Sequence, residues 1–278
     1  MSLVTLLYCP IMARLASPVM ASWSARYRAG ECFAVWNELR AYGPDGVPEA
    51  HREDAEEVAR ETMGRVAANV DVVVERLAAA HYAFAFPERA RQVPTDDDLI
   101  AVRRAEQIIG PMPLALRSCL EIVGGVDLCG DGGAALPHVS YHADPYEDWV
   151  LYPDPLVLPS GVYLWHDWES WGGDVEQGCA CTDHDEGELC RFHSEGFPFT
   201  FAPDEVHKAS VSGSEQDIML PSKSADPELF GSRRTGVTLV EYLRISLAWG
   251  GFPGYDAGPA DAALPKMIEE LRRDLLMF

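Results

Sequence analysis

The chain has 278 residues, 47% of them hydrophobic, which is enough for a sizeable core in one large domain or two small ones. With 44 acidic and 22 basic residues, its formal net charge is -22 at pH 7. Such a charge repels nucleic-acid phosphates and anionic membrane surfaces and attracts basic partners, although it also serves solubility. We therefore expect no nucleic-acid partner and no membrane partner.

Residues 1–22 are predicted to form a loose N-terminal tail. Their apolar run follows no positive charge and is interrupted by Pro10, so it lacks the pattern of a signal peptide and is too short to span a bilayer. The seven cysteines show no regular spacing of the kind that disulfide-stapled secreted proteins have, and we expect Cys32 and Cys119 to be buried thiols. Together these features predict a cytoplasmic protein.

Residues 23–112 predict an N-terminal helical region. In 31–42, four apolar residues fall on one helical stripe: Cys32, Val35, Trp36 and Leu39. A long amphipathic helix is expected over 53–80, with these residues on its buried face: Ala55, Val58, Met63, Val66, Val70, Val73 and Leu77. A third helix should begin after Thr95, whose side chain can cap it, while the aspartates at 96–98 complement the positive end of the helix dipole.

Residues 113–278 change from helix to short strands and back to helix. Pro113 can start a fourth helix, which the glycine pair at 124–125 ends. Short apolar runs then predict strands at 125–129, 148–152, 156–158, 162–166, 199–203, 208–213 and 217–221. Thr238 and Glu241 have the spacing of a capping box, and a last helix opens at Pro265. This order predicts an α+β fold with an antiparallel or mixed sheet.

Several segments are similar to bacterial proteins of the SUKH superfamily. The segment PMPLALRSCLEIVGGVDL resembles the proline-led helix and glycine pair that open these domains, and four other segments add to the likeness: VARETMGRVAANVDVVVERL, FAPDEVHKASVSG, DIMLPSKSADPELFG and TLVEYLRISLAWGGFPGYD. The likeness covers about residues 31–256 apart from the cysteine-rich stretch. It implies a single α+β domain with a curved, mainly antiparallel sheet packed by helices. Many members bind and neutralise toxins as immunity proteins and others are regulatory interaction modules, with no catalytic residues common to all.

The stretch GCACTDHDEGELCRFH, at 178–193, is the strongest candidate for a metal site. Two pairs have the two-residue spacer that lets one tight turn present two zinc ligands, and Cys179 is a fifth candidate: Cys181 with His184, and Cys190 with His193. The surrounding insertion, 172–195, is acidic and has little apolar content of its own, so a structural zinc ion would hold it together. The alternatives are a flexible acidic loop with free thiols and a catalytic metal centre, which would need an open ligand position.

The segment WHDWESW, at 165–171, is the candidate partner-binding surface. Tryptophan is enriched where interfaces concentrate their binding energy, so the predicted partner-binding residues are Trp165, Trp168, Glu169 and Trp171. Packing of the tryptophans within the fold is the competing interpretation. A catalytic dyad of His166 and Asp167 is disfavoured, because neighbouring residues on a predicted strand point to opposite faces.

The sequence therefore predicts a protein that binds another protein, most simply an immunity protein that neutralises a basic toxin through an acidic surface. We predict no catalytic residues. A metal-dependent enzyme that uses the Cys and His cluster is one alternative, and a regulatory scaffold protein is another.

Overall fold

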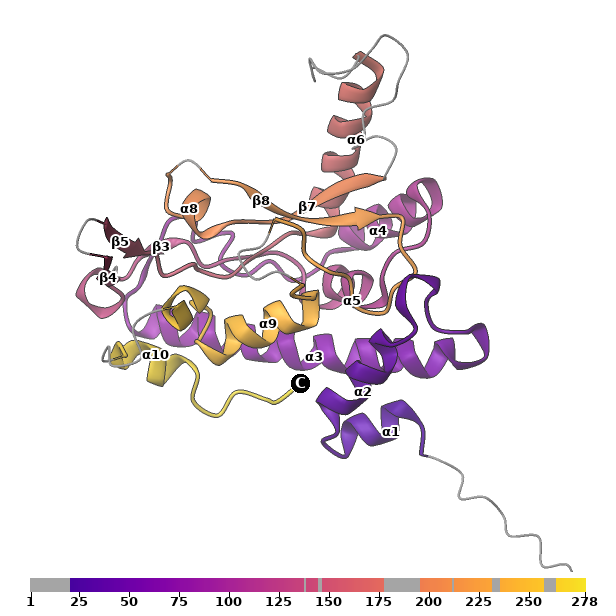
Figure 1. The fold of residues 1–278 in the computed structure, drawn as a ribbon, viewed down its shortest axis with the longest axis horizontal. Coiled ribbons are helices and arrows are strands. Elements are labelled where there is room, and N and C mark those ends of the chain that lie inside the picture. The colour runs from indigo at the N-terminus through magenta and orange to yellow at the C-terminus, as the bar shows by residue number, and fades with distance from the viewer. Residues whose placement is uncertain are drawn as a thin grey trace, which may run out of the picture.

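The computed structural model describes residues 21–137, 139–144, 147–177, 196–211, 213–231, 236–257 and 264–278, and only the backbone of 139–144, 147–151 and 173–177. Its α-helices are α1 (Trp23–Arg28), α2 (Cys32–Arg40), α3 (Glu49–Ala79), α4 (Asp96–Ile109), α5 (Leu114–Ser118), α6 (Gly161–Gln177), α8 (Glu205–Lys208), α9 (Leu239–Ala248) and α10 (Lys266–Leu271). Its strands are β1 (Ala83–Phe84), β2 (Val126–Asp127), β3 (Gly130–Asp131), β4 (Val139–Asp144), β5 (Glu147–Leu151), β6 (Val157–Leu158), β7 (Phe197–Pro203) and β8 (Glu215–Leu220). Figure 1 shows α3 and α9 along one side, β7 and β8 on the other, and α6 rising from the strand side.

The N-terminal helical region is present as predicted. Helix α3 buries every apolar residue expected of it, and the four residues of the predicted stripe on α2 are wholly buried. The indole Nε1 of Trp36 donates to Thr62 Oγ1 at 3.0 Å, so the polar atom of this buried ring keeps a partner. Each large apolar side chain buried in this way contributes about 1.5–3 kcal/mol to folding.

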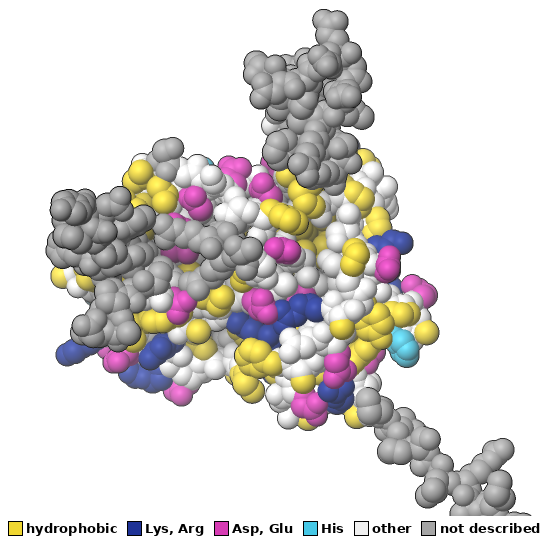
Figure 2. Space-filling view, viewed as in Figure 1, with side chains coloured by type: hydrophobic (Ala, Val, Ile, Leu, Met, Phe, Trp, Pro, Cys, Tyr) yellow, Lys and Arg dark blue, Asp and Glu magenta, His cyan; other side chains and the backbone are white. Residues whose placement is uncertain are grey.

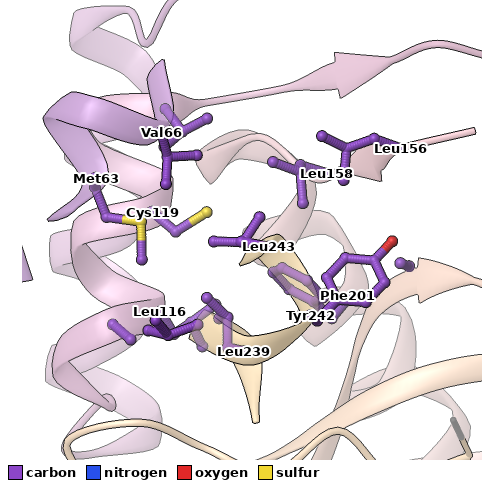
Figure 3. Close-up of a cluster of buried hydrophobic side chains, with 14 of the residues drawn as sticks. Met63, Val66, Leu116, Cys119, Leu156, Leu158, Phe201, Leu239, Tyr242 and Leu243 are labelled. Atoms are coloured by element: carbon purple, nitrogen blue, oxygen red, sulfur yellow. The ribbon is translucent and has the colours of Figure 1, made fainter. Parts of the chain in front are cut away.

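One continuous core joins the helices to the strands. Figure 3 shows buried side chains from α3, α5, α9 and the strands that point toward one another: Met63, Val66, Leu116, Cys119, Leu156, Leu158, Phe201, Leu239, Tyr242 and Leu243. Cys32 and Cys119 are both wholly buried free thiols, as predicted. The later α+β part therefore packs directly on α3.

The described strands all pair antiparallel, and the fold is α+β as predicted. They form four separate two-stranded ladders: β1 with β3, β2 with β6, β4 with β5, and β7 with β8. In the last ladder the register runs from Phe197 opposite Leu220 to Pro203 opposite Glu215, with an irregularity between Thr200 and Ala202. The continuous curved sheet implied by the family resemblance is therefore divided into short ladders in the part that the structure describes.

Helix-capping residues act as the sequence predicts. Thr95 and Asp98 form a capping box at the start of α4, and Thr238 and Glu241 form one at the start of α9. The fourth helix begins after Pro113, continues as a π-helical turn over Cys119–Val123 and ends at Gly124. Gly124 has a φ of 74°, and a Cβ there would lie 2.4 Å from the carbonyl oxygen of Gln92, so a side chain would not fit.

Two predicted strands are wrong. The run 162–166 lies within α6, because Leu164, Trp168 and Trp171 recur at helical spacing and pack on the core. The run 208–213 begins at the end of α8 and continues into a turn with Ser210 at φ 60°. Asp204 caps that short helix, since its side chain accepts the backbone N–H groups of Val206 and His207. In both places tertiary packing and capping prevail over the local preference for strand.

No helix in the described ranges is both long enough and apolar enough to cross a membrane.

Candidate partner-binding site

Helix α6 is anchored at its first residues to the start of α4. The Oδ1 atom of Asp98 accepts the backbone N–H of Val162 at 3.0 Å, and the other carboxylate oxygen accepts the hydroxyl of Thr95 at 2.7 Å. The two backbones approach so closely that a Cβ on Gly161 would lie 2.5 Å from the carbonyl oxygen of Asp98. Only glycine fits at this contact, which fixes where α6 leaves the body of the molecule.

The three predicted tryptophans of α6 are partly buried and pack against the fold. The guanidinium of Arg104 on α4 lies 4.0 Å from the ring centroid of Trp165. Trp168 and Trp171 lie 5.2 Å apart, and each packs on Phe197 of β7 at 5.3 and 5.4 Å. This geometry favours the packing interpretation for the indole rings, while their partner-binding role stays a prediction.

Glu169 lies on the exposed side of α6. Its carboxylate is 3.8 Å from the Nδ1 atom of His166, and both side chains are more than half exposed. His166 and Asp167 form no pair, since Asp167 turns instead toward β7 and accepts the backbone N–H of Thr200 at 3.0 Å. His166 and Asp167 therefore do not form the hydrogen-bonded pair that a catalytic dyad requires.

Three carboxylates gather where α6 meets β7 and β8. Strand β8 alternates between exposed and buried residues, which places Glu215 and Asp217 on the same side. Asp167 comes from α6, one helical turn after Tyr163, whose ring packs beside Phe199 at 6.3 Å. We call the set of Tyr163, Asp167, Thr200, Glu215 and Asp217 the acidic face.

Burial and like charge raise the pKa of the groups on the acidic face. The pKa of Asp217 rises to about 6, because its carboxylate is partly buried and lies close to the carboxylates of Glu215 and Asp167. The pKa of Asp167 is also raised, mainly by burial and also by the charge of Glu215. The hydrogen bond that Asp167 accepts from the backbone N–H of Thr200 opposes this shift. Burial and the same three carboxylates raise the pKa of Tyr163 to about 12.

The charge of the acidic face is not compensated within the described part of the chain. None of its three carboxylates has an ion pair there. Glu215 accepts the hydroxyl of Thr200 at 3.2 Å, and the Oδ1 atom of Asp217 is buried without a hydrogen-bond partner. Figure 2 shows acidic side chains spread over the upper part of the molecule, where Figure 1 draws β8 and the base of α6.

A hollow of about 440 Å³ adjoins the acidic face. Tyr163, Thr200 and Glu215 line it together with residues of β2, β6 and β7. Its other charged or titratable lining residues are Arg89, Asp127 and His207. Its volume is within the range of ordinary ligand sites. A side chain from a partner could therefore enter beside the carboxylates instead of resting on a flat surface.

The predicted zinc ligands lie outside the described residues. This holds for Cys179, Cys181, His184, Cys190 and His193, so the zinc site stays a prediction. Within the described ranges, no group of three or more His, Cys, Asp or Glu side chains is arranged to hold a metal ion. The three carboxylates of the acidic face are therefore not arranged as a metal centre.

A buried lysine forms an ion pair at the end of α8. Lys208 is completely buried, and its Nζ lies 2.6 Å from Asp154 Oδ1 and 3.4 Å from the hydroxyl of Tyr242. Burial opposes the charge on Lys208, but the phenol of Tyr242 and the carboxylate of Asp154 outweigh it and raise its pKa. A lysine held in its charged form is neither a nucleophile nor a general base, so we assign this group a structural role.

The chain matches no protein-family model, and no curated protein or solved structure was found similar to it. The resemblance to the SUKH superfamily thus rests on the quoted segments alone. None of the residues of the acidic face was predicted as a site, and Asp167 was considered only as a member of the disfavoured dyad with His166. A signal for Tyr163 and Asp167 was present, because the apolar positions 164, 168 and 171 of that segment already have helical spacing.

Proposed function

We propose that this protein binds a basic protein partner through the acidic face. The observation that carries the proposal is the group of three carboxylates, Asp167, Glu215 and Asp217, which repel one another without a described cation between them. Neighbouring like charges raise the free energy of the unbound state. A lysine or arginine side chain of a partner would relieve this repulsion.

The biological role that we propose is that of an immunity protein. Two observations support it: the net charge of -22, and the likeness of five segments to the SUKH superfamily. A nuclease toxin must hold phosphate and is therefore usually basic, so an acidic inhibitor meets it with complementary potential and a fast association rate. Inhibition would follow from covering the surface that the toxin needs for its substrate.

The test compares which proteins of the source cell are captured by three forms of the full chain. The first is the wild type, and the second carries Asp167→Asn, Glu215→Gln and Asp217→Asn. The third is a matched control with the same loss of charge on the exposed side of α3, Glu49→Gln, Glu53→Gln and Glu75→Gln, three residues without a described ion pair. Each form is immobilised and exposed to the proteins of the source cell, and bound proteins are identified by mass spectrometry.

We expect wild type and control to retain the same basic protein and the acidic-face variant to lose it. Expression of that protein alone should arrest growth, and co-expression of wild type should restore it. A retained partner without toxicity would favour the regulatory scaffold over the immunity protein. Equal retention by all three forms, or no basic partner at all, would exclude the acidic face as the binding surface.

A further inference from the structure

A second hollow lies between α9, α10 and the last residues of the described chain. It measures about 500 Å³, and it shares no lining residue with the hollow beside the acidic face. We call it the C-terminal groove. Its walls are mainly apolar and include Phe33, Leu247, Leu275, Leu276 and Met277.

The walls of the C-terminal groove are fixed by hydrogen bonds to α3. Asn69 donates to the carbonyl of Leu276 at 2.8 Å and accepts its N–H at 2.7 Å, and Arg65 donates to the carbonyl of Met277 at 2.9 Å. These bonds hold the backbone while the side chains of Leu276 and Met277 stay more than half exposed. The groove is therefore formed in advance, which lowers the entropic cost of binding.

The C-terminal groove is also positively charged, in contrast to the chain as a whole. Arg244, Arg272 and Arg273 line it against one acidic residue, Glu269. Arg272 and Arg273 have no ion pair in the described ranges. Figure 2 shows Lys and Arg side chains beside hydrophobic ones in the lower part of the molecule, where Figure 1 draws α9, α10 and the C-terminal end.

Arg244 is held in place and incompletely bonded. Its Nε donates to a terminal carboxyl oxygen of Phe278 at 2.7 Å, its Nη2 donates to the carbonyl of Cys32 at 3.3 Å, and its guanidinium lies 4.1 Å from the ring centroid of Phe33. Its Nη1 is buried without a hydrogen-bond partner. Burial lowers the pKa of Arg244.

We propose that the C-terminal groove binds a small carboxylate with an aliphatic body. The volume is that of a small-molecule site, the aliphatic and aromatic walls suit a hydrocarbon chain, and the arginines suit its charged end. A compact phosphate would leave these apolar walls in contact with water, so a carboxylate with a hydrocarbon chain fits better. This inference does not depend on the proposed function, because the acidic face lies on other residues.

The probe is octanoate, and octanamide is its uncharged analogue with the same aliphatic body. Isothermal titration calorimetry with the full chain should give a dissociation constant for octanoate of about 1 mM or below. Octanamide should bind at least about fivefold more weakly, because it cannot form charge-assisted hydrogen bonds with arginine.

Three variants locate the binding. Arg272→Gln with Arg273→Gln should weaken octanoate binding at least about fivefold, since two of the three cations are removed. Arg103→Gln with Lys223→Gln removes two exposed charges elsewhere and should leave octanoate binding unchanged.

Ala248→Trp keeps every charge but fills the groove that Ala248 lines, and should abolish octanoate binding. Equal binding of octanoate and octanamide, or unchanged binding by the Arg272 and Arg273 variant or the Ala248 variant, would overturn the proposal.

Discussion

Asp217 shows at the scale of one residue what the sequence could not reveal. Its strand was predicted at 217–221, whereas Glu215 lies before that range and is part of the strand only in the folded chain. The third carboxylate of the group belongs to Asp167, which is distant in the sequence and lies in a helix that was predicted as a strand. Burial and the neighbouring carboxylates raise the pKa of Asp217 to about 6, and both depend on tertiary packing that local patterns do not encode.

Replacing Asp217 by asparagine should stabilise the protein at neutral pH and above. The pKa of Asp217 rises from 3.8 to about 6 on folding, so the folded state holds the proton more tightly, and the wild type loses stability as pH rises through this window. After allowance for solvent screening, the variant should gain on the order of 1 kcal/mol at pH 8.

This gain should shrink as the pH falls below about 6 and vanish below 3.8, where the carboxyl becomes protonated in both states. Urea unfolding at several pH values measures it, with Glu75→Gln as the exposed control that should show no such trend. A variant that is less stable than wild type at pH 8 would contradict the raised pKa of Asp217.

Lys208 and Asp154 should behave as a mutually dependent pair. Lys208→Met leaves the carboxylate of Asp154, 16% exposed, without its cation and should cost about 3–5 kcal/mol. Adding Asp154→Asn removes that uncompensated charge and should recover at least half of the loss. Urea unfolding of the single and double variants checks this, and equal losses in both would argue against the ion pair.

At the scale of elements, helices were predictable and two short segments were not. The periodic apolar residues of α3 and the capping residues of α4 and α9 are local signals, and all of them are confirmed. Helix α6 was misread because its aromatic and β-branched residues are also typical of strands. What decides the outcome is the contact of Trp168 and Trp171 with Phe197, which the intervening insertion separates from them in sequence.

The docking of α6 can be tested with a matched pair of glycine variants in the same helix. Gly161→Ala places a Cβ 2.5 Å from a backbone oxygen of α4 and should destabilise the protein by about 2 kcal/mol. Gly172→Ala meets no atom within 4 Å and should leave stability unchanged or raise it by up to about 1 kcal/mol. Thermal unfolding distinguishes them, and equal melting temperatures would contradict the close approach at Gly161.

The predicted zinc insertion, 172–195, calls for a separate measurement. Elemental analysis of the purified protein should give about one zinc ion per chain, because four ligands satisfy one structural site. Cys181→Ser should lower that content and make this segment more susceptible to proteolysis, while binding of the protein partner stays unchanged. If the wild-type protein contains no metal, the alternative of a flexible acidic loop with free thiols would be favoured over the zinc site.

At the scale of the whole molecule, composition predicted the sign of the surface charge but not its distribution. The fold separates a cluster of carboxylates beside α6 and β8 from a groove lined by arginines beside α9 and α10. The net charge of -22 gave no indication of the second site. Its arginines are spread over α9 and the last segment, and only the folded chain brings them to one groove.

The most direct test of the central claim is the affinity of the captured basic partner for wild type and for the variant with Asp167→Asn, Glu215→Gln and Asp217→Asn. Calorimetry at low and high salt should show at least about a tenfold loss of affinity in the variant and a weaker dependence on salt. The control with Glu49→Gln, Glu53→Gln and Glu75→Gln should bind as wild type does. Equal affinity of all three forms at both salt concentrations would contradict the assignment of the acidic face as the partner-binding site.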